Sequence, residues 1–163
     1  MDTGVIILVI GLCMVLTPLG YIGLKSANRS EKLREQGLEF EGLFSYEGGL
    51  DGVLPENLAN LEVFTDCVKL ILSKKDEYIC YSQIQKVKIM SRTQVESYVS
   101  SGRLAMFGVL SLAMKKNKDV DMFYTIIELK DNQSIILSTK FRNKCEKVYE
   151  YLNKNLQNYN LSN

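Results

Sequence analysis

Residues 122–139, MFYTIIELKDNQSIILST, contain two β-prone runs on either side of Asp131-Asn132. Runs rich in β-branched and aromatic residues favour strands, and the Asp-Asn pair between them is typical of a two-residue hairpin turn. The next stretch predicts an amphipathic helix, with Thr139 as a possible N-cap. Its apolar side chains recur at spacings of four and three: Phe141, Cys145, Val148, Leu152, Leu156 and Tyr159. We expect this helix to cover one open face of the sheet, because a sheet with one apolar face needs a cover.

Further strand-like segments precede this hairpin. Alternation of apolar and polar side chains begins at Leu61, and residues 61–66, 68–72 and 77–82 predict strands, with a turn at residues 74–76. Ile84, Val87 and Ile89 suggest another strand, bulged between Ile84 and Val87. Residues 42–58 are rich in turn formers and contain a short strand at 43–46. The fold class is therefore α+β: an antiparallel sheet or partly open barrel, capped by a C-terminal helix.

Residues 4–24, GVIILVIGLCMVLTPLGYIGL, form an uncharged apolar run. At about 1.5 Å per residue, such a helix reaches roughly 31 Å, which matches the hydrocarbon thickness of a bilayer. A cleaved secretory signal would need a basic start and a shorter core, and Leu12 is not the small residue expected before a lipoprotein cysteine at Cys13. The run therefore predicts an uncleaved single-span anchor rather than a signal peptide or a buried soluble helix.

Flanking charge predicts the orientation of this anchor. Four basic residues follow it: Lys25, Arg29, Lys32 and Arg34. Nothing basic precedes it except the amino terminus, so the positive-inside rule places the N-terminus outside and the C-terminal domain in the cytoplasm of a single-pass cell-membrane protein. The three cysteines after the span form no C-x-x-C pair, as expected of reduced thiols. We expect Cys67, Cys80 and Cys145 to fill the core as small hydrophobic side chains rather than form a redox or metal site.

The sequence divides into an anchor at 1–24, a juxtamembrane linker or helix at 25–42, a domain at 43–158 and a tail at 159–163. Ser30 is a plausible N-cap and Gly37 a stop for a short helix in the linker. Charge separates along the chain: residues 63–163 carry 16 basic and 10 acidic side chains, and residues 25–62 carry 4 and 8. The basic body would be attracted to an anionic membrane. Alternatively, its lysines are scattered, solvated and screened by salt.

The order of elements resembles that of pleckstrin-homology-like (PH-like) domains, in particular the small bacterial PH-domain proteins, several of which carry a terminal membrane helix. The resemblance covers about residues 43–156. It rests on Tyr81-Ser82-Gln83-Ile84 leading into Lys86-Val87, the small-residue stretch 101–116, the strand pair 123–129 and 134–137, and the final helix. The chain has no tryptophan and lacks the Lys/Arg spacing of phosphoinositide-binding members near residues 69–75. The resemblance therefore implies a binding or scaffolding module without catalysis, and transfers no inositol-phosphate site.

Residues 97–118 interrupt the sheet pattern and contain no acidic side chain. An apolar centre with a basic rim is typical of segments that contact an anionic leaflet. The candidate lipid-contact or partner-contact residues are Arg103, Met106, Phe107, Lys115, Lys116 and Lys118. The alternative is that residues 104–112 form one more buried strand or hairpin, with residues 115–119 as its turn.

Composition excludes several function classes. Of 163 residues none is histidine, which removes Ser-His-Asp and Cys-His catalysis and histidine-ligated zinc or haem. The net charge of +1 gives no field for nucleic acid. The carboxylate pairs Glu39/Glu41 and Asp119/Asp121 lie in polar surroundings where solvated acids are usual. We therefore expect no enzyme and no cofactor or metal, but a membrane-anchored module that recognises a protein partner, its own copies or an anionic lipid surface. The alternative is an accessory subunit of a larger membrane complex, with Gly11, Gly20 and Gly23 allowing close helix packing.

Overall fold

The computed structural model describes residue 29 and residues 31–50, 52–100 and 121–162. The chain divides into two compact units, Met1–Gly37 and Leu38–Asn163. The second unit contains the following elements: β1 (Leu38–Gly48), β2 (Glu56–Phe64), β3 (Cys67–Ile71), β4 (Asp76–Cys80), the 3-10 helix η1 (Tyr81–Gln83), β5 (Ile84–Ser91), α2 (Arg92–Ser100), β6 (Phe123–Leu129), β7 (Ser134–Thr139) and α4 (Arg142–Ser162).

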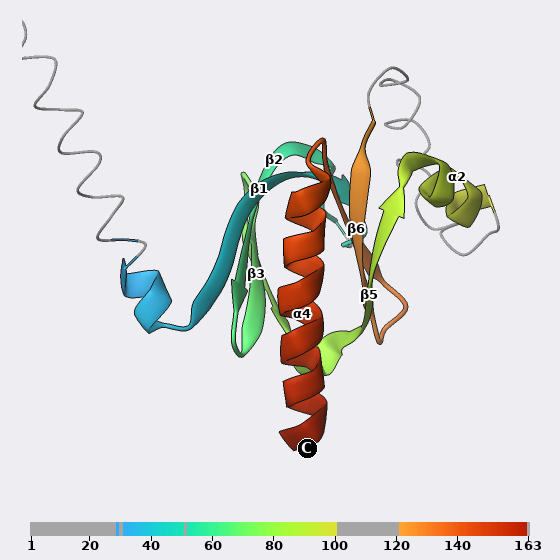
Figure 1. The fold of residues 1–163 in the computed structure, drawn as a ribbon. Coiled ribbons are helices and arrows are strands. Elements are labelled where there is room, and N and C mark those ends of the chain that lie inside the picture. Colours follow the sequence, from blue (N-terminus) through green and yellow to red (C-terminus); the bar gives the residue numbers. More distant parts are fainter. Residues whose placement is uncertain (1–28, 30, 51, 101–120, 163) are drawn as a thin grey trace, which may run out of the picture. The chain divides into compact units, whose positions relative to one another are not determined.

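The seven strands form one antiparallel sheet in the order β4-β3-β2-β1-β7-β6-β5. The sheet is open, since the described strands place β4 and β5 at its two edges. Strand β1 joins the two halves, β2–β4 on one side and β5–β7 on the other (Figure 1). This arrangement confirms the expected α+β class and is compatible with the PH-like layout.

The long helix α4 lies across one face of the sheet (Figure 1). Three residues of the predicted stripe, Cys145, Val148 and Leu152, are fully buried in the main hydrophobic core. They pack with side chains from both halves of the sheet, including Leu61, Leu70, Ile135 and Leu137. Burial of such side chains is worth roughly 1.5–3 kcal/mol each, so this stripe holds the helix on the sheet.

The last hairpin agrees with its prediction. Strands β6 and β7 pair from Phe123↔Thr139 to Glu128↔Ser134, and Asn132 in the turn has a positive φ of 68°. Asparagine tolerates this conformation better than most residues. The predicted bulge of β5 is also present, as a register shift between Ile84 and Lys86 against β6.

Other expectations were wrong in detail. Strand β1 begins at Leu38, five residues before the expected strand. Residues 38–44 pair with β2, and Gly42 is part of this ladder rather than a turn. Thr65 and Asp66 form the turn between β2 and β3, and do not continue a strand. Tyr81 and Ser82 lie in η1 rather than in a strand. Helix α2 was not predicted.

Side-chain placement also differs from expectation at three positions. Phe141 precedes α4 and is 62% exposed, although it fits the spacing of the stripe. Cys67 is half-buried and Cys80 exposed, so of the three cysteines described only Cys145 fills the core. Cys67 and Cys80 instead belong to the outer face of the β3–β4 hairpin, whose inner face carries the buried Val68 and Ile79.

In the first unit, residues 31–35 are helical and end in a turn at Gly37, which has a φ of 88°. This confirms Gly37 as the expected helix stop, because a left-handed terminal residue is typically glycine. The expected anchor at residues 4–24 lies outside the described residues. Among the residues that the structure does describe, none belongs to a helix long and apolar enough to cross a membrane.

Candidate functional site

Strand β1 has different neighbours along its length. Its first part, Leu38–Phe44, pairs only with β2. From Ser45 onward it also pairs with β7, with Ser45 opposite Ser138. Within the described part of the chain, the second edge of residues 38–44 therefore has no strand beside it. An unpaired edge of this kind is a template for another extended chain.

The register shows which backbone groups point out of this edge. In an antiparallel ladder, alternate residues direct their N–H and C=O groups to opposite sides. The Leu129 N–H donates to the Gln133 carbonyl at 2.8 Å in the β6–β7 hairpin, so alternation along β7 turns the backbone groups of Ser138 towards β1. Its partner Ser45 therefore directs its groups towards β7, and Leu43 and Glu41 face the same way. The Leu43 carbonyl confirms this direction, since it accepts a hydrogen bond of 3.2 Å from Lys144 Nζ on α4.

A groove lies between this edge and the start of α4. We call it the α4–β1 groove; it has a volume of about 410 Å³ and is lined by Phe40, Phe141, Asn143, Lys144 and Lys147. Phe40 comes from β1 and packs obliquely against Tyr151 and Phe44, with ring centroids 6.2 and 6.4 Å apart. The groove thus combines aromatic walls with amide and ammonium groups.

Lys144 occupies the centre of this arrangement. Its ammonium lies 5.7 Å from the ring centroid of Phe44 and 5.8 Å from that of Phe141, in addition to its bond to the Leu43 carbonyl. Cation–π contacts at exposed sites contribute roughly 0.5–1 kcal/mol. Lys144 therefore fixes the aromatic walls and places a positive charge at the unpaired edge.

The start of α4 is basic. The cations are Lys140, Arg142, Lys144 and Lys147, and the first turn contains no acidic residue. Cations near a helix N-terminus are repelled by the positive end of the helix dipole, and a bound anion reduces this repulsion. Arg142 is paired with Glu146 at 2.8 Å, whereas no ion pair joins Lys140 or Lys147 to another described residue. The charge of the groove is thus largely uncompensated.

A polar network holds the other half of α4 on the sheet. Asn155 is 4% exposed, and its Nδ2 lies 2.6 Å from Glu39 Oε2, 3.0 Å from Tyr81 Oη and 3.1 Å from the Phe64 carbonyl. The Tyr81 hydroxyl donates to the same Phe64 carbonyl at 2.7 Å. Lys154 binds the second Glu39 oxygen at 2.7 Å. The network joins β1, β2, η1 and α4, and so positions the helix that lines the groove.

The bulge in β1 directs Glu39 into this network. The register shifts between Leu38 and Phe40, and an extra residue in a strand re-aims its side chain. Burial alone would raise the pKa of Glu39, but hydrogen bonds from Lys154 and Asn155, with the charge of Lys154, lower it below its usual value. Burial raises the pKa of Tyr81 to about 12 despite its bond from Asn155, so the phenol remains a neutral donor.

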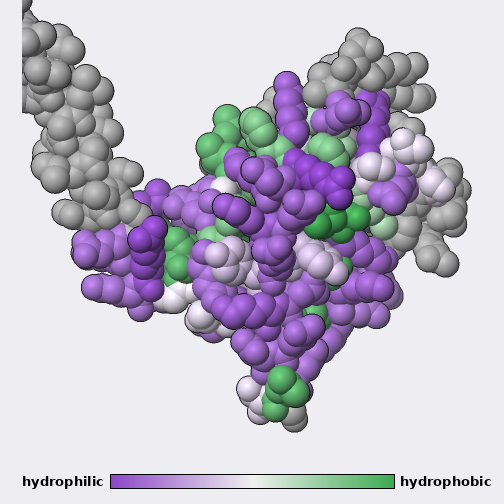
Figure 2. All heavy atoms as spheres, in the orientation of Figure 1, coloured by the Kyte–Doolittle hydropathy of each residue, from purple (hydrophilic) through white to green (hydrophobic). Residues whose placement is uncertain are grey.

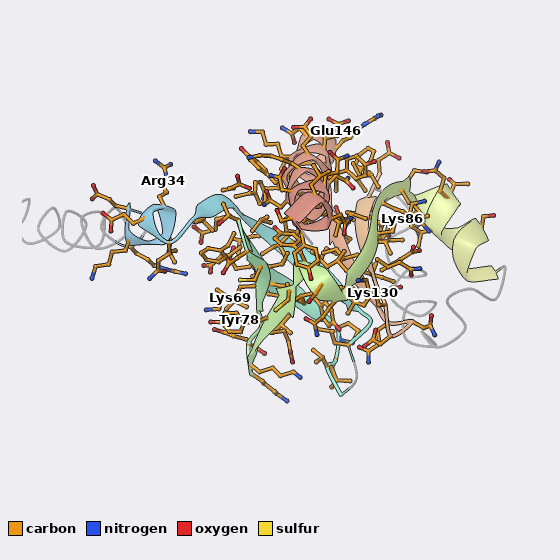
Figure 3. The ribbon with its side chains drawn as sticks, turned by 90° about the horizontal axis from the view of Figure 1, so that it is seen from below. Arg34, Lys69, Tyr78, Lys86, Lys130 and Glu146 are labelled. Atoms are coloured by element: carbon orange, nitrogen blue, oxygen red, sulfur yellow. The ribbon has the colours of Figure 1, made fainter. Side chains whose placement is uncertain are left out.

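Other polar side chains lie on different sides of the domain. In Figure 3, Glu146 lies on the side of α4 that faces away from the sheet, and Lys69 and Tyr78 lie together on the far side. The surface over α4 is largely hydrophilic, with hydrophobic patches beside the helix (Figure 2). Among the described residues, no cluster of three or more Cys, Asp or Glu side chains is arranged to hold a metal ion.

The residues predicted from the sequence to contact lipid or a partner all lie outside the described residues: Arg103, Met106, Phe107, Lys115, Lys116 and Lys118. The α4–β1 groove was missed. Lys144 and Lys147 lie off the apolar stripe predicted for the final helix, and residue 40 falls in the predicted linker at 25–42. The one available signal was the absence of acidic residues between Lys140 and Lys144 in an otherwise mixed helix.

No family model matches the chain, and no curated protein sequence matches it significantly.

Proposed function

We propose that this chain is a membrane-anchored, non-catalytic binding module of the PH-like type, which recognises a protein partner through the α4–β1 groove. Support for the PH-like assignment comes from the strand order β4-β3-β2-β1-β7-β6-β5 and the covering C-terminal helix. Tethering by residues 4–24 is proposed from sequence, as is the cytoplasmic position of the domain. The unpaired half-edge of β1 is the observation that carries the proposed recognition of protein.

A strand edge selects polypeptide over other ligands. Backbone N–H and C=O groups in register form hydrogen bonds with another extended chain, and adjoining pockets select its side chains. Here Leu43 and Glu41 direct backbone groups outward, beside the aromatic and cationic lining of the groove. The partner segment favoured by this surface is extended and acidic, with an aromatic or aliphatic side chain to pack on Phe40 and Phe141.

Photo-crosslinking from single positions tests this function in native membranes. Replacement of Phe141 by p-benzoylphenylalanine places a reactive group at the groove, and the same replacement of Tyr78, which is 60% exposed, places it on the far side of the sheet. We expect a defined crosslinked partner from position 141, and loss of that product when Lys144→Glu and Lys147→Glu are added. Equal crosslinking from both positions would contradict recognition at the groove.

Vesicle flotation separates protein recognition from lipid recognition. If the same cations serve an anionic leaflet, the domain will float with phosphatidylglycerol vesicles, and Lys144→Glu with Lys147→Glu will abolish flotation. A second pair, Lys115→Glu with Lys116→Glu, tests the lipid contact proposed for residues 97–118. Flotation that depends on either pair, without a protein crosslink from position 141, would replace the protein partner by a lipid surface.

A further inference from the structure

Two cysteines face each other across neighbouring strands. In the β3–β4 ladder, Cys67 lies directly opposite Cys80. Residues directly opposite in an antiparallel pair project from the same face of the sheet. The flanking pair, Val68 and Ile79, is buried in the core, so both thiols are on the outer face. Cys67 is half-buried and Cys80 is exposed.

The hydrogen-bond pattern defines the type of pair that they form. The Leu72 N–H donates to the Lys75 carbonyl at 3.0 Å, which makes these residues a hydrogen-bonded pair. Hydrogen-bonded and non-hydrogen-bonded pairs alternate along the ladder, so Cys67 and Cys80 are a non-hydrogen-bonded pair. The Cys80 N–H agrees, because it turns away from β3 and donates to Gln83 Oε1 at 2.9 Å.

Non-hydrogen-bonded pairs bring side chains together. Their Cα atoms are about 4.5 Å apart, within the range of about 4.4–6.8 Å found for disulfides. Their Cβ atoms lie about 4.5–5.5 Å apart, slightly beyond the usual disulfide separation of about 3.5–4.5 Å. A bond is therefore within reach after a small approach of the strands. It would carry strain, and strained or exposed disulfides are the easily reduced ones.

We propose that Cys67 and Cys80 form a reversible cross-strand disulfide when the protein meets a low-molecular-weight disulfide. The exposed Cys80 loses its proton, and its thiolate attacks one sulfur of the small disulfide and displaces one thiolate. The Cys67 thiol then loses its proton and attacks the Cys80 sulfur of the mixed disulfide, which forms the Cys67–Cys80 bond and releases the second thiolate. The protein loses two electrons and two protons, and the small disulfide is reduced to two thiols.

The surroundings assign different roles to the two thiols. Burial, followed by the charge of Asp66, raises the pKa of Cys67 to about 11, so this residue is protonated at neutral pH and does not start the exchange. Two residues further along β3, Lys69 forms an ion pair of 2.8 Å with Asp76, and its ammonium lies 5.2 Å from the ring centroid of Tyr78. These contacts hold β3 and β4 in register, and so keep Cys67 placed to resolve the mixed disulfide.

The bond would lock an exposed part of the sheet. Strand β4 is an edge strand of the described sheet, and Tyr81, next to Cys80, joins the network that holds α4. A disulfide closing the hairpin restricts the unfolded chain and stops β4 from separating from β3. Oxidation thus holds the edge strand β4 on β3, next to the residues that contact α4, and reduction allows β4 to separate again.

Oxidised glutathione is the probe for the test, applied to the full chain in detergent micelles. We expect two thiols to become unavailable to iodoacetamide, non-reducing peptide maps to join the peptides of Cys67 and Cys80, and the midpoint of thermal unfolding to rise by several degrees. Dithiothreitol should reverse all three changes. Cys145→Ser, which removes a buried thiol, serves as the control and should leave the disulfide unchanged.

Two further variants make the result decisive. Cys67→Ser should trap glutathione on Cys80 as a stable mixed disulfide, because the resolving thiol is missing. Cys80→Ser should leave Cys67 largely unmodified. A wild-type chain that keeps glutathione on Cys80, or that joins Cys80 to another chain or to Cys13 or Cys145, would overturn the inference.

Discussion

At the scale of single residues, Asn155 shows how one polar side chain can fix the position of a helix. It lies on the buried face of α4 and donates to groups from β1, β2 and η1. Two amide hydrogens serve three acceptors, so the sites compete and the network depends on accurate placement. A polar group buried without a hydrogen-bond partner lowers the free energy of unfolding by about 1–3 kcal/mol. The network therefore stabilises one position of α4 on the sheet relative to others.

The ionisation of Glu39 should make the free energy of unfolding depend on pH. Its pKa is below the ordinary value of 4.5 in the folded chain, because hydrogen bonds from Lys154 and Asn155 favour the carboxylate. A lowered folded pKa contributes stability above the ordinary pKa, and this contribution is lost as the pH falls through the folded value. We expect Glu39→Gln to destabilise the chain by about 1 kcal/mol at pH 7 and by less at acid pH, since a neutral amide accepts weaker hydrogen bonds.

Urea unfolding followed by far-UV circular dichroism at pH 7 and at pH 3 measures both values. Glu41→Gln is the matched control, because Glu41 lies in the same strand but is exposed, and among the described residues its carboxylate accepts one side-chain hydrogen bond, from Asn60 Nδ2 at 2.8 Å. A Glu39→Gln penalty that is the same at both pH values would contradict the assigned role of the carboxylate.

Residue patterns predicted the core better than they predicted polar contacts. Spacing of four and three identified Cys145, Val148 and Leu152 as buried, because helix geometry alone places them on one face. Asn155 also lies on that face, but its partners are 74 to 116 residues away in the sequence. The pairing of Cys67 with Cys80 depends on the loop length between two strands, and a shift by one residue would have separated them.

At the scale of elements, the connection from β1 to β2 contains one glycine, Gly49, that has no room for a Cβ. Gly49 has a φ of 119°, and a Cβ at this position would lie 1.6 Å from the Ser134 carbonyl oxygen at the start of β7. Because that oxygen is backbone, Gly49→Ala forces β1 and β7 apart as well as straining φ. We expect a loss of about 3 kcal/mol or more in unfolding free energy.

Gly52→Ala is the control for this prediction. Gly52 has a φ of 72° but nothing within 4 Å of the added carbon, so only the conformational strain of about 1–2 kcal/mol remains. Urea titration of both variants by circular dichroism suits a chain without tryptophan. Equal losses would show that the close approach of Gly49 to Ser134 does not matter.

Element types were easier to predict than element edges. The hairpin of β6 and β7 carries its own signals, with β-branched runs on both sides of a turn pair. Strand β1 extends to Leu38 through Glu39, Glu41 and Gly42, none of which favours a strand. Pairing with β2 and contacts to α4 override these local preferences, and this long-range effect is also what creates the α4–β1 groove.

At the scale of the whole molecule, the sequence predicts that anchor and domain are separable. Residues 4–24 are apolar and uncharged, and the compact unit that contains the sheet begins at Leu38. All the strands and the core of the described chain belong to this unit, which buries its own apolar side chains. We therefore expect residues 25–163 to form a soluble, folded and largely β domain, and the full chain to fractionate with membranes.

Two measurements check this separation. Circular dichroism of residues 25–163 should show a β-rich spectrum with cooperative urea unfolding, and sodium carbonate washing should leave the full chain in the membrane pellet. A basic peripheral protein would be released by salt or high pH, because charge attraction is screened while apolar insertion is not. As a control, Leu8→Arg with Ile10→Arg should weaken membrane retention, since charges near the bilayer centre are costly. An insoluble or helical fragment, or a full chain released by carbonate, would contradict the division into anchor and domain.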